Sequence, residues 1–280
     1  MAVGFERKGQ RMIDFASSFT QFVLATFIPL YLGMIFVMLL KETAHISARN
    51  LSAFALGLLF WFFLDTLNDA IQLDVNEGFS YGFQHAALLL LFVVGFLSLA
   101  LLSGLGISAR VGVNEETDPF FVGILVALGM GFHGVGEGLG FGGTSAGTSA
   151  MTVLDAIGGY GGGAAYVLHK FLEATLVTIV YVSLTDEKLG LREQLWRLVA
   201  LGLTFGIPSA VGDVVGYYVP VDSSYFFALG GGAALFVALL VMKPIFGTNA
   251  RGEFTHSQWI RVVVALLVGF LALYAAASLH

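Results

Sequence analysis

The sequence predicts an all-α membrane protein of eight transmembrane helices, and two observations carry this prediction. Of the 280 residues, 57% are hydrophobic and 11% are charged, whereas a soluble domain typically carries about 25% charged residues. The charges fall in short clusters between apolar runs long enough to cross a bilayer, which takes about 20 helical residues. A membrane β-barrel would instead show alternating strands of about ten residues. We therefore expect a single transmembrane domain over residues 1–280, surrounded by lipid.

The eight predicted spans follow one another with short connections, so no separate soluble domain is expected. They cover residues 18–40, 51–67, 83–105, 119–141, 158–184, 194–218, 224–243 and 259–279. A piece rich in glycine, serine and threonine, residues 142–163, is expected to include the loop between the fourth and fifth spans.

Lysine and arginine predict the orientation of the bundle, because they favour the cytoplasmic side of a membrane. Nine of them lie in or beside the loops after spans one, three, five and seven, three lie at the N-terminus, and Lys170 lies inside span five. Both termini are therefore expected outside the cytoplasm, with the plasma or cell membrane as the location. The predicted outer side also carries many acidic residues, which would either concentrate cations there or act as ordinary solvated loop charges.

An internal repeat is also predicted. Residues 28–33 (IPLYLG) in span one match residues 207–212 (IPSAVG) in span six, and residues 54–57 (FALG) in span two match residues 227–230 (FALG) in span seven. Spans one to three (18–105) then recur as spans six to eight (194–279), around a central pair, 119–184. An offset of five spans inverts one copy in the membrane, and inverted repeats are typical of transporters.

Two polar pairs interrupt the central spans. His133 and Glu137 in span four, and His169 and Glu173 in span five, are each four residues apart, so each pair shares one face of a helix. Ionisable groups at membrane depth are costly unless they are paired, hydrated or used. A single pair could simply join helices by hydrogen bonding, but two equal pairs on successive spans form the N/O ligand set of a divalent transition metal. We therefore expect an intramembrane metal site, with the metal ion as substrate.

Two further ionisable residues are expected near this site. Lys170 adjoins His169, and its ammonium needs a carboxylate partner at membrane depth, from Glu137, Glu173 or Asp213. Such a charge could take the place of a second metal ion; alternatively, Lys170 reaches an interface. Near the outer end of span two, Asp65, Asn68 and Asp69 could gather cations at an entrance or simply lie at a solvated helix end.

These motifs resemble those of the ZIP (Zrt/Irt-like) divalent metal transporters. Residues 133–138 (HGVGEG) look like the family's fourth-span signature, His-Asn-x-Pro-Glu-Gly, and residues 169–173 (HKFLE) resemble its fifth-span signature, His-Glu-x-Pro-His/Glu. Residues 227–230, followed by Lys243 and Pro244, are similar to the seventh span. The resemblance implies that His133, Glu137, His169 and Glu173 are metal ligands and that metal moves into the cytoplasm.

Departures from the family pattern modify this expectation. Gly134 and Lys170 stand where two-metal members carry further ligands, so the chain resembles a one-metal variant. Gly136 and Leu172 replace the family prolines. Asp213 loosely matches another carboxylate of the family's site. We expect Lys170 and Asp213 to lie beside the four ligands or at a second metal site.

Several alternatives stay open at this level. The ligand set suits Zn²⁺ first and also Fe²⁺, Mn²⁺ or Cd²⁺, whereas Mg²⁺ and Ca²⁺ prefer oxygen. We expect a transporter and therefore not an enzyme. The alternative is a membrane-embedded zinc-dependent hydrolase that uses the same residues. A purely structural bundle is the third alternative. The absence of cysteine excludes thiolate ligands and disulfides, and the net charge of −6 argues against a nucleic-acid partner. The oligomeric state is open, a homodimer included.

Overall fold

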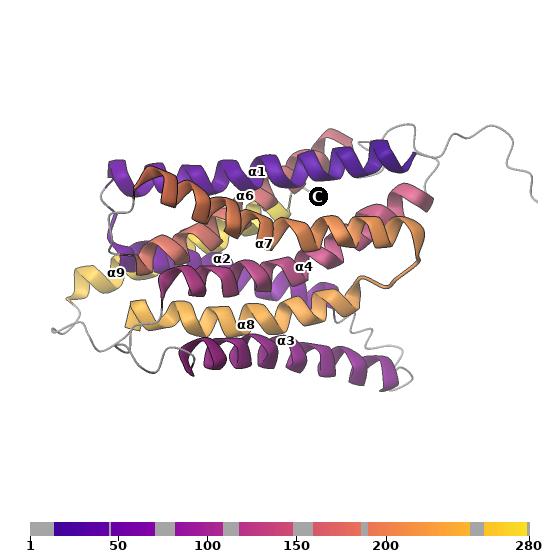
Figure 1. Ribbon diagram of the computed structural model, residues 1–280. Helices are drawn as coiled ribbons and strands as arrows, with labels where there is room; N and C mark the ends of the chain where they lie inside the picture. The colour runs from indigo at the N-terminus through magenta and orange to yellow at the C-terminus, as the bar shows by residue number, and fades with distance from the viewer. Residues whose placement is uncertain are drawn as a thin grey trace, which may run out of the picture.

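The computed structural model describes residues 14–44, 46–70, 82–108, 118–147, 159–185, 190–246 and 255–278. Within these ranges it contains eight helices, which run side by side along one direction (Figure 1). With the labels of Figure 1, they are α1 (Phe15–Ala44), α2 (Ala48–Ala70), α3 (Gly82–Ser108), α4 (Pro119–Gly147), α6 (Gly159–Leu184), α7 (Leu191–Tyr218), α8 (Ser224–Phe246) and α9 (His256–Ala277). All eight are long and apolar enough to cross a membrane, so the predicted all-α class and the eight predicted spans are confirmed.

Several helices extend beyond the predicted spans, because capping and packing decide where a helix ends. α1 begins at Phe15 rather than at residue 18, since the Ser17 N–H donates to the Asp14 carboxylate at 3.0 Å and thereby lowers the pKa of Asp14. α9 begins at His256 rather than at residue 259, since Thr255 and Gln258 form a reciprocal capping box. α4 continues to Gly147, through the first residues of the predicted loop.

The two ends of the bundle are named after one charged residue at each, Lys41 and Asp14. At one end, which we call the Lys41 end, the Lys41 ammonium donates to the Val182 and Thr185 oxygens at 2.9 Å each, so α1 and α6 finish together. At the opposite end, which we call the Asp14 end, α1 and α6 begin and α4 and α7 finish (Figure 1).

Helices α4 and α6 lie at the centre of the bundle. Of the most apolar stretch of each, 61% and 67% is buried, compared with 22% in both α3 and α9. The predicted central pair therefore occupies the interior, where ionisable side chains are shielded from lipid.

Glycines allow α4 to pack directly against the backbone of α7. A Cβ at Gly138 would lie 2.2 Å from the Ser209 backbone oxygen, and one at Gly142 would lie 2.2 Å from that of Asp213. No pair of non-bonded atoms approaches so closely. Gly138 and Gly142 therefore set the distance between the two helices, as small residues do in other close membrane-helix contacts.

Two further contacts, α2–α9 and α3–α8, are built alike. Each contains one glycine on either helix, Gly57 with Gly269 and Gly95 with Gly232, and a Cβ on any of the four would lie within 2.1 Å of a backbone oxygen of the partner. Gly232 follows Gly57 by 175 positions and Gly269 follows Gly95 by 174. These separations are close to those of the matched sequence segments, which are 179 positions (28 to 207) and 173 positions (54 to 227).

We expect the Gly138→Ala variant to be destabilised by about 1–3 kcal/mol or more, because its Cβ would force α4 and α7 apart. Gly140→Ala is the matched control: a Cβ there meets nothing within 4 Å, so the better helix propensity of alanine should leave stability equal or slightly higher. Thermal unfolding of both purified proteins in detergent measures the difference. Equal midpoints for the two variants would contradict the proposed packing.

Candidate metal centre

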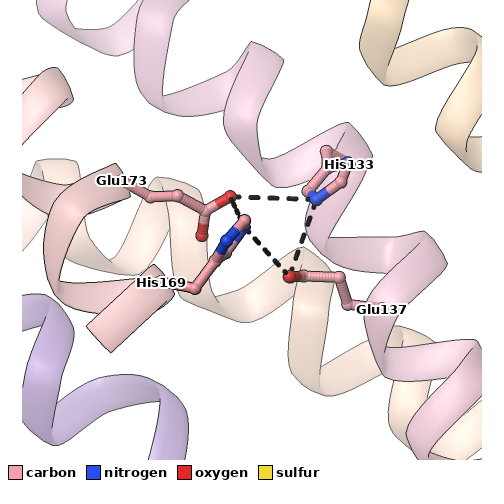
Figure 2. A group of neighbouring side chains, drawn as sticks. All are labelled: His133, Glu137, His169 and Glu173. Carbon is pink, nitrogen blue, oxygen red and sulfur yellow. Dashed lines mark ion pairs between the residues drawn. The ribbon is translucent and has the colours of Figure 1, made fainter. Parts of the chain in front are cut away.

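Four side chains from α4 and α6 meet in the interior of the bundle. His133 and Glu137 lie one turn apart on α4, and His169 and Glu173 lie one turn apart on α6. Each contributes one ligand atom, and these four atoms all lie within 4.8 Å of one another. Figure 2 shows the tips of the two pairs meeting in the space between the helices.

Each histidine Nε2 faces the glutamate Oε1 of its own helix and also the glutamate Oε1 of the other helix. The distance from His169 Nε2 to Glu173 Oε1 is 3.3 Å, and that from His133 Nε2 to Glu137 Oε1 is 3.6 Å. Both cross-helix distances, from His133 Nε2 to Glu173 Oε1 and from His169 Nε2 to Glu137 Oε1, are 3.8 Å. Two imidazole nitrogens and two carboxylate oxygens therefore surround one common point, as metal ligands do.

The cluster is shielded from solvent, with one side chain less buried than the rest. His133, His169 and Glu173 are 3%, 7% and 1% exposed, whereas the Glu137 side chain is 14% exposed. Glu173 Oε1 accepts no hydrogen bond from the described residues, although it faces both imidazoles. A buried oxygen without a hydrogen bond calls for an explanation, and a cation at the common point would supply one.

Lys170 binds the opposite edges of the two carboxylates. Its ammonium contacts Glu137 Oε2 and lies 2.5 Å from Glu173 Oε2, and it is fully buried. Each carboxylate therefore directs Oε1 toward the imidazoles and Oε2 toward the ammonium. The alternative that Lys170 reaches an interface is wrong, because its charge lies inside the bundle beside two of the three predicted partners.

Residues from α2 and α8 orient His133. The Thr66 hydroxyl lies 3.2 Å from His133 Nδ1, which leaves Nε2 to face the carboxylates. The rings of Phe62 and Phe227 pack on the imidazole at centroid distances of 4.5 and 5.1 Å. A hydrogen bond to the second ring nitrogen is the usual way in which a metal-binding histidine is held. Thr66 was missed at the sequence level, since a single threonine in an apolar span carries no distinguishing signal.

The His/Glu pair on α4 and the pair on α6 are each held by one neighbouring helix that packs closely at a glycine. A Cβ at Gly33 of α1 would lie 2.4 Å from the Phe171 oxygen of α6, and one at Gly212 of α7 would lie 2.3 Å from the Val135 oxygen of α4. Val135 and Phe171 are 36 positions apart, as are His133 and His169. Helix α1 therefore holds α6 as α7 holds α4.

Packing also explains the glycine in the first motif. A Cβ at Gly134 would lie 2.0 Å from the Ser209 Oγ and 3.2 Å from the Ser209 Cβ, so a side chain there requires the Ser209 hydroxyl to turn away. At the position that corresponds to Lys170 on the other helix, a side chain would therefore compete with Ser209 for space.

The other predicted site residues lie apart from the four-residue cluster. Asp213 is fully buried on α7, but it is not among the grouped ligands and forms no ion pair with Lys170 among the described residues. Asp65 is partly buried near the end of α2, and the side chains of Asn68 and Asp69 lie outside the described residues. The predicted entrance role of these three residues stays a prediction.

Aromatic rings cover the cluster on the side of the Asp14 end. Phe22 of α1 packs on Phe141 of α4 and on Tyr166 of α6 at centroid distances of 4.9 and 6.2 Å. The Tyr166 hydroxyl hydrogen-bonds Thr26 at 2.9 Å. Because Phe141 and Tyr166 lie one turn from Glu137 and Lys170, this aromatic layer separates the cluster from the Asp14 end.

No protein-family model and no curated protein matches this sequence. The assignment of the site therefore depends on its own chemistry. A buried cluster of two histidines and two glutamates inside an apolar helical bundle is suited to a metal ion.

We expect the Thr66→Val variant to lower metal affinity about 10- to 100-fold, because His133 loses the hydrogen bond that orients it. Thr178→Val is the matched control, since the buried Thr178 hydroxyl donates to the Ala174 oxygen within α6 rather than to any of the four ligands. Titration of the purified proteins with Co²⁺, followed by visible absorption, compares the affinities. Equal losses in both variants would show that Thr66 has no specific role.

Proposed function

We propose that the protein is a divalent transition-metal transporter that imports its substrate through the His133–Glu137–His169–Glu173 cluster. The observation that supports this most directly is the convergence of four ligand atoms within 4.8 Å inside a membrane-like bundle. Zn²⁺ is the leading substrate, and Fe²⁺, Mn²⁺ and Cd²⁺ suit the same ligands. Protons compete with the metal for these groups, because the ligands bind metal in their deprotonated forms.

The charge distribution supports movement into the cytoplasm. Among the described residues, the lysines and arginines other than Lys170 belong to the last turn of α1 or α8 or to the first two turns of α2, α7 or α9, all at the Lys41 end. The positive-inside rule assigns that end to the cytoplasm. The Asp14 end, with Asp14 and Asp222, would then face outward, in a plasma or cell membrane, and attract cations.

The paired glycine contacts support an inverted repeat. The α2–α9 and α3–α8 contacts correspond to each other, and so do the α1–α6 and α7–α4 contacts, with the cluster between the two halves. Transporters with this design bind substrate near the midplane and release it when one unit rocks against another. Together with the two motifs, this arrangement supports our proposal that the chain is a ZIP-type transporter.

The contacts of Lys170 support a site for a single metal ion. Its ammonium holds the two Oε2 atoms that a second cation would otherwise bridge. With neutral imidazoles, two carboxylates and one ammonium carry a net charge of −1, so a divalent cation is still attracted. A free second metal would meet the fixed charge of Lys170.

The hydrolase alternative requires an acid or base beside the bound metal. Lys170 is engaged with both carboxylates, and Asp213 does not join the cluster. These contacts favour transport, and sealed vesicles separate the two activities, because a transporter accumulates metal without altering lipid or peptide.

We expect proteoliposomes containing the full chain to accumulate Zn²⁺ down its gradient, measured with a trapped fluorescent indicator. His133→Ala and Glu173→Ala should reduce uptake to the level of protein-free vesicles, because each removes a ligand. Glu193→Gln is the matched control: this exposed glutamate on α7 pairs only with Arg197 in the described part of the chain, and the variant should match the wild type. Wild-type uptake by the ligand variants at equal protein content would refute the proposed function.

We expect the wild-type protein to bind one Zn²⁺ per chain and Lys170→Asp to bind two, because the substitution replaces a fixed cation by a further ligand. Elemental analysis of the purified proteins after equilibrium dialysis measures the stoichiometry. Lys170→Arg keeps the charge and should stay at one metal per chain. A second metal in the wild type that is also bound by Asp213→Asn would contradict the role assigned to Lys170.

A further inference from the structure

Three buried polar side chains near the Asp14 end have no partner in the described part of the chain. Asp213 of α7, Ser18 of α1 and Ser145 of α4 are each 0% exposed. Neither carboxylate oxygen of Asp213 and neither serine hydroxyl forms a hydrogen bond to a described residue. Buried polar groups are nearly always paired, so a cluster of unpaired ones indicates a site for something polar.

Asp213 points to the junction of α1, α4 and α7. On the same face of α7, seven residues earlier, Gly206 packs against Phe27 of α1, and four residues later Tyr217 packs against Phe15 of α1 at 5.2 Å. This spacing places Asp213 on the α1-facing side of α7. Its backbone also contacts α4 beside Gly142.

The two serines lie at the same junction. Phe22 of α1 and Phe141 of α4 pack together at 4.9 Å, and the two helices run in opposite directions. Ser18 lies one turn before Phe22, and Ser145 lies one turn after Phe141, so both are about 5.4 Å nearer the Asp14 end than these rings. Asp213, Ser18 and Ser145 therefore occupy neighbouring turns of three adjoining helices, beyond the aromatic layer that covers the His/Glu cluster.

A structural role does not require a carboxylate at this position. One position beyond the matched segments 28–33 and 207–212, position 34 of α1 corresponds to position 213 of α7, and the residue there is Met34, which is also fully buried. An unpaired carboxylate at membrane depth costs several kcal/mol more than an apolar side chain. Such a residue is retained at this depth when it serves an ion pathway.

We propose that Asp213, Ser18 and Ser145 form a second cation site, which receives a partly hydrated divalent metal between the Asp14 end and the His/Glu cluster. The site offers only oxygen atoms, which bind transition metals more weakly than imidazole does, so the ion stays briefly and moves on past the aromatic layer. This inference rests on the proposed transport function and adds a preceding step to it.

The test compares how fast and how tightly purified full-length protein binds Co²⁺. Stopped-flow absorption follows the association of Co²⁺ with the His/Glu cluster, and equilibrium titration measures its affinity. Asp213→Asn should slow association at least about tenfold, because a buried charge that concentrates cations is lost, while the equilibrium affinity stays within about twofold of the wild type. Asp222→Asn is the matched control: this exposed residue caps α8 through the Ser224 N–H at 2.9 Å, a role that asparagine keeps, and its rate should be unchanged.

Each further outcome decides the question. An unchanged association rate in Asp213→Asn, or a loss of equilibrium affinity equal to that of His133→Ala, would overturn the second site. If Asp213→Asn does not fold, the Ser18→Ala/Ser145→Ala double variant replaces it: slower association with unchanged affinity supports the inference, and an unchanged rate overturns it. Failure of the wild type to bind Co²⁺ would instead refute the proposed function itself.

Discussion

The division of two carboxylates between an ammonium and two imidazoles is the interaction on which the interior of this protein depends. Glu137 and Glu173 would repel each other if they were buried together without compensation. Lys170 holds their Oε2 atoms and reduces that repulsion, so both Oε1 atoms can point toward His133 and His169. The lysine thereby stabilises the cluster and leaves both Oε1 atoms facing the imidazoles, an arrangement that could hold a metal ion.

Such a cluster requires helices that approach one another closely, and glycine makes this approach possible. Along α4, Gly138 and Gly142 bring the backbone against α7, while Gly33 brings α1 against α6. The same device closes the α2–α9 and α3–α8 contacts. Polar groups in the centre are thus held by helices whose backbones pack closely on both sides.

Much of this arrangement follows from the sequence, because it depends on local spacing. The length of the apolar runs predicts the eight helices, and the four-residue spacing of His133 with Glu137 and of His169 with Glu173 predicts that each pair shares a face. What could not be predicted depends on residues distant in the chain. Thr66 reaches His133 from another helix, and Ser209 of α7 lies against Gly134. The pairing of Lys170 with a carboxylate was predicted, but only packing decides that Glu137 and Glu173, rather than Asp213, are its partners. Helix ends were likewise set by caps such as Thr255, to which hydropathy is insensitive.

The tethering of Lys170 has an electrical consequence. Because its ammonium is held by both carboxylates, a divalent cation bound as proposed would change the charge of the cluster from −1 to +1, with neutral imidazoles in both states. A charge inside a membrane responds to voltage, by about 2.3 kcal/mol per elementary charge for each 100 mV crossed. If the cluster changes its position within the bilayer, a cytoplasm-negative potential draws the loaded form inward and the emptied form outward. The membrane potential would then favour both halves of an import cycle.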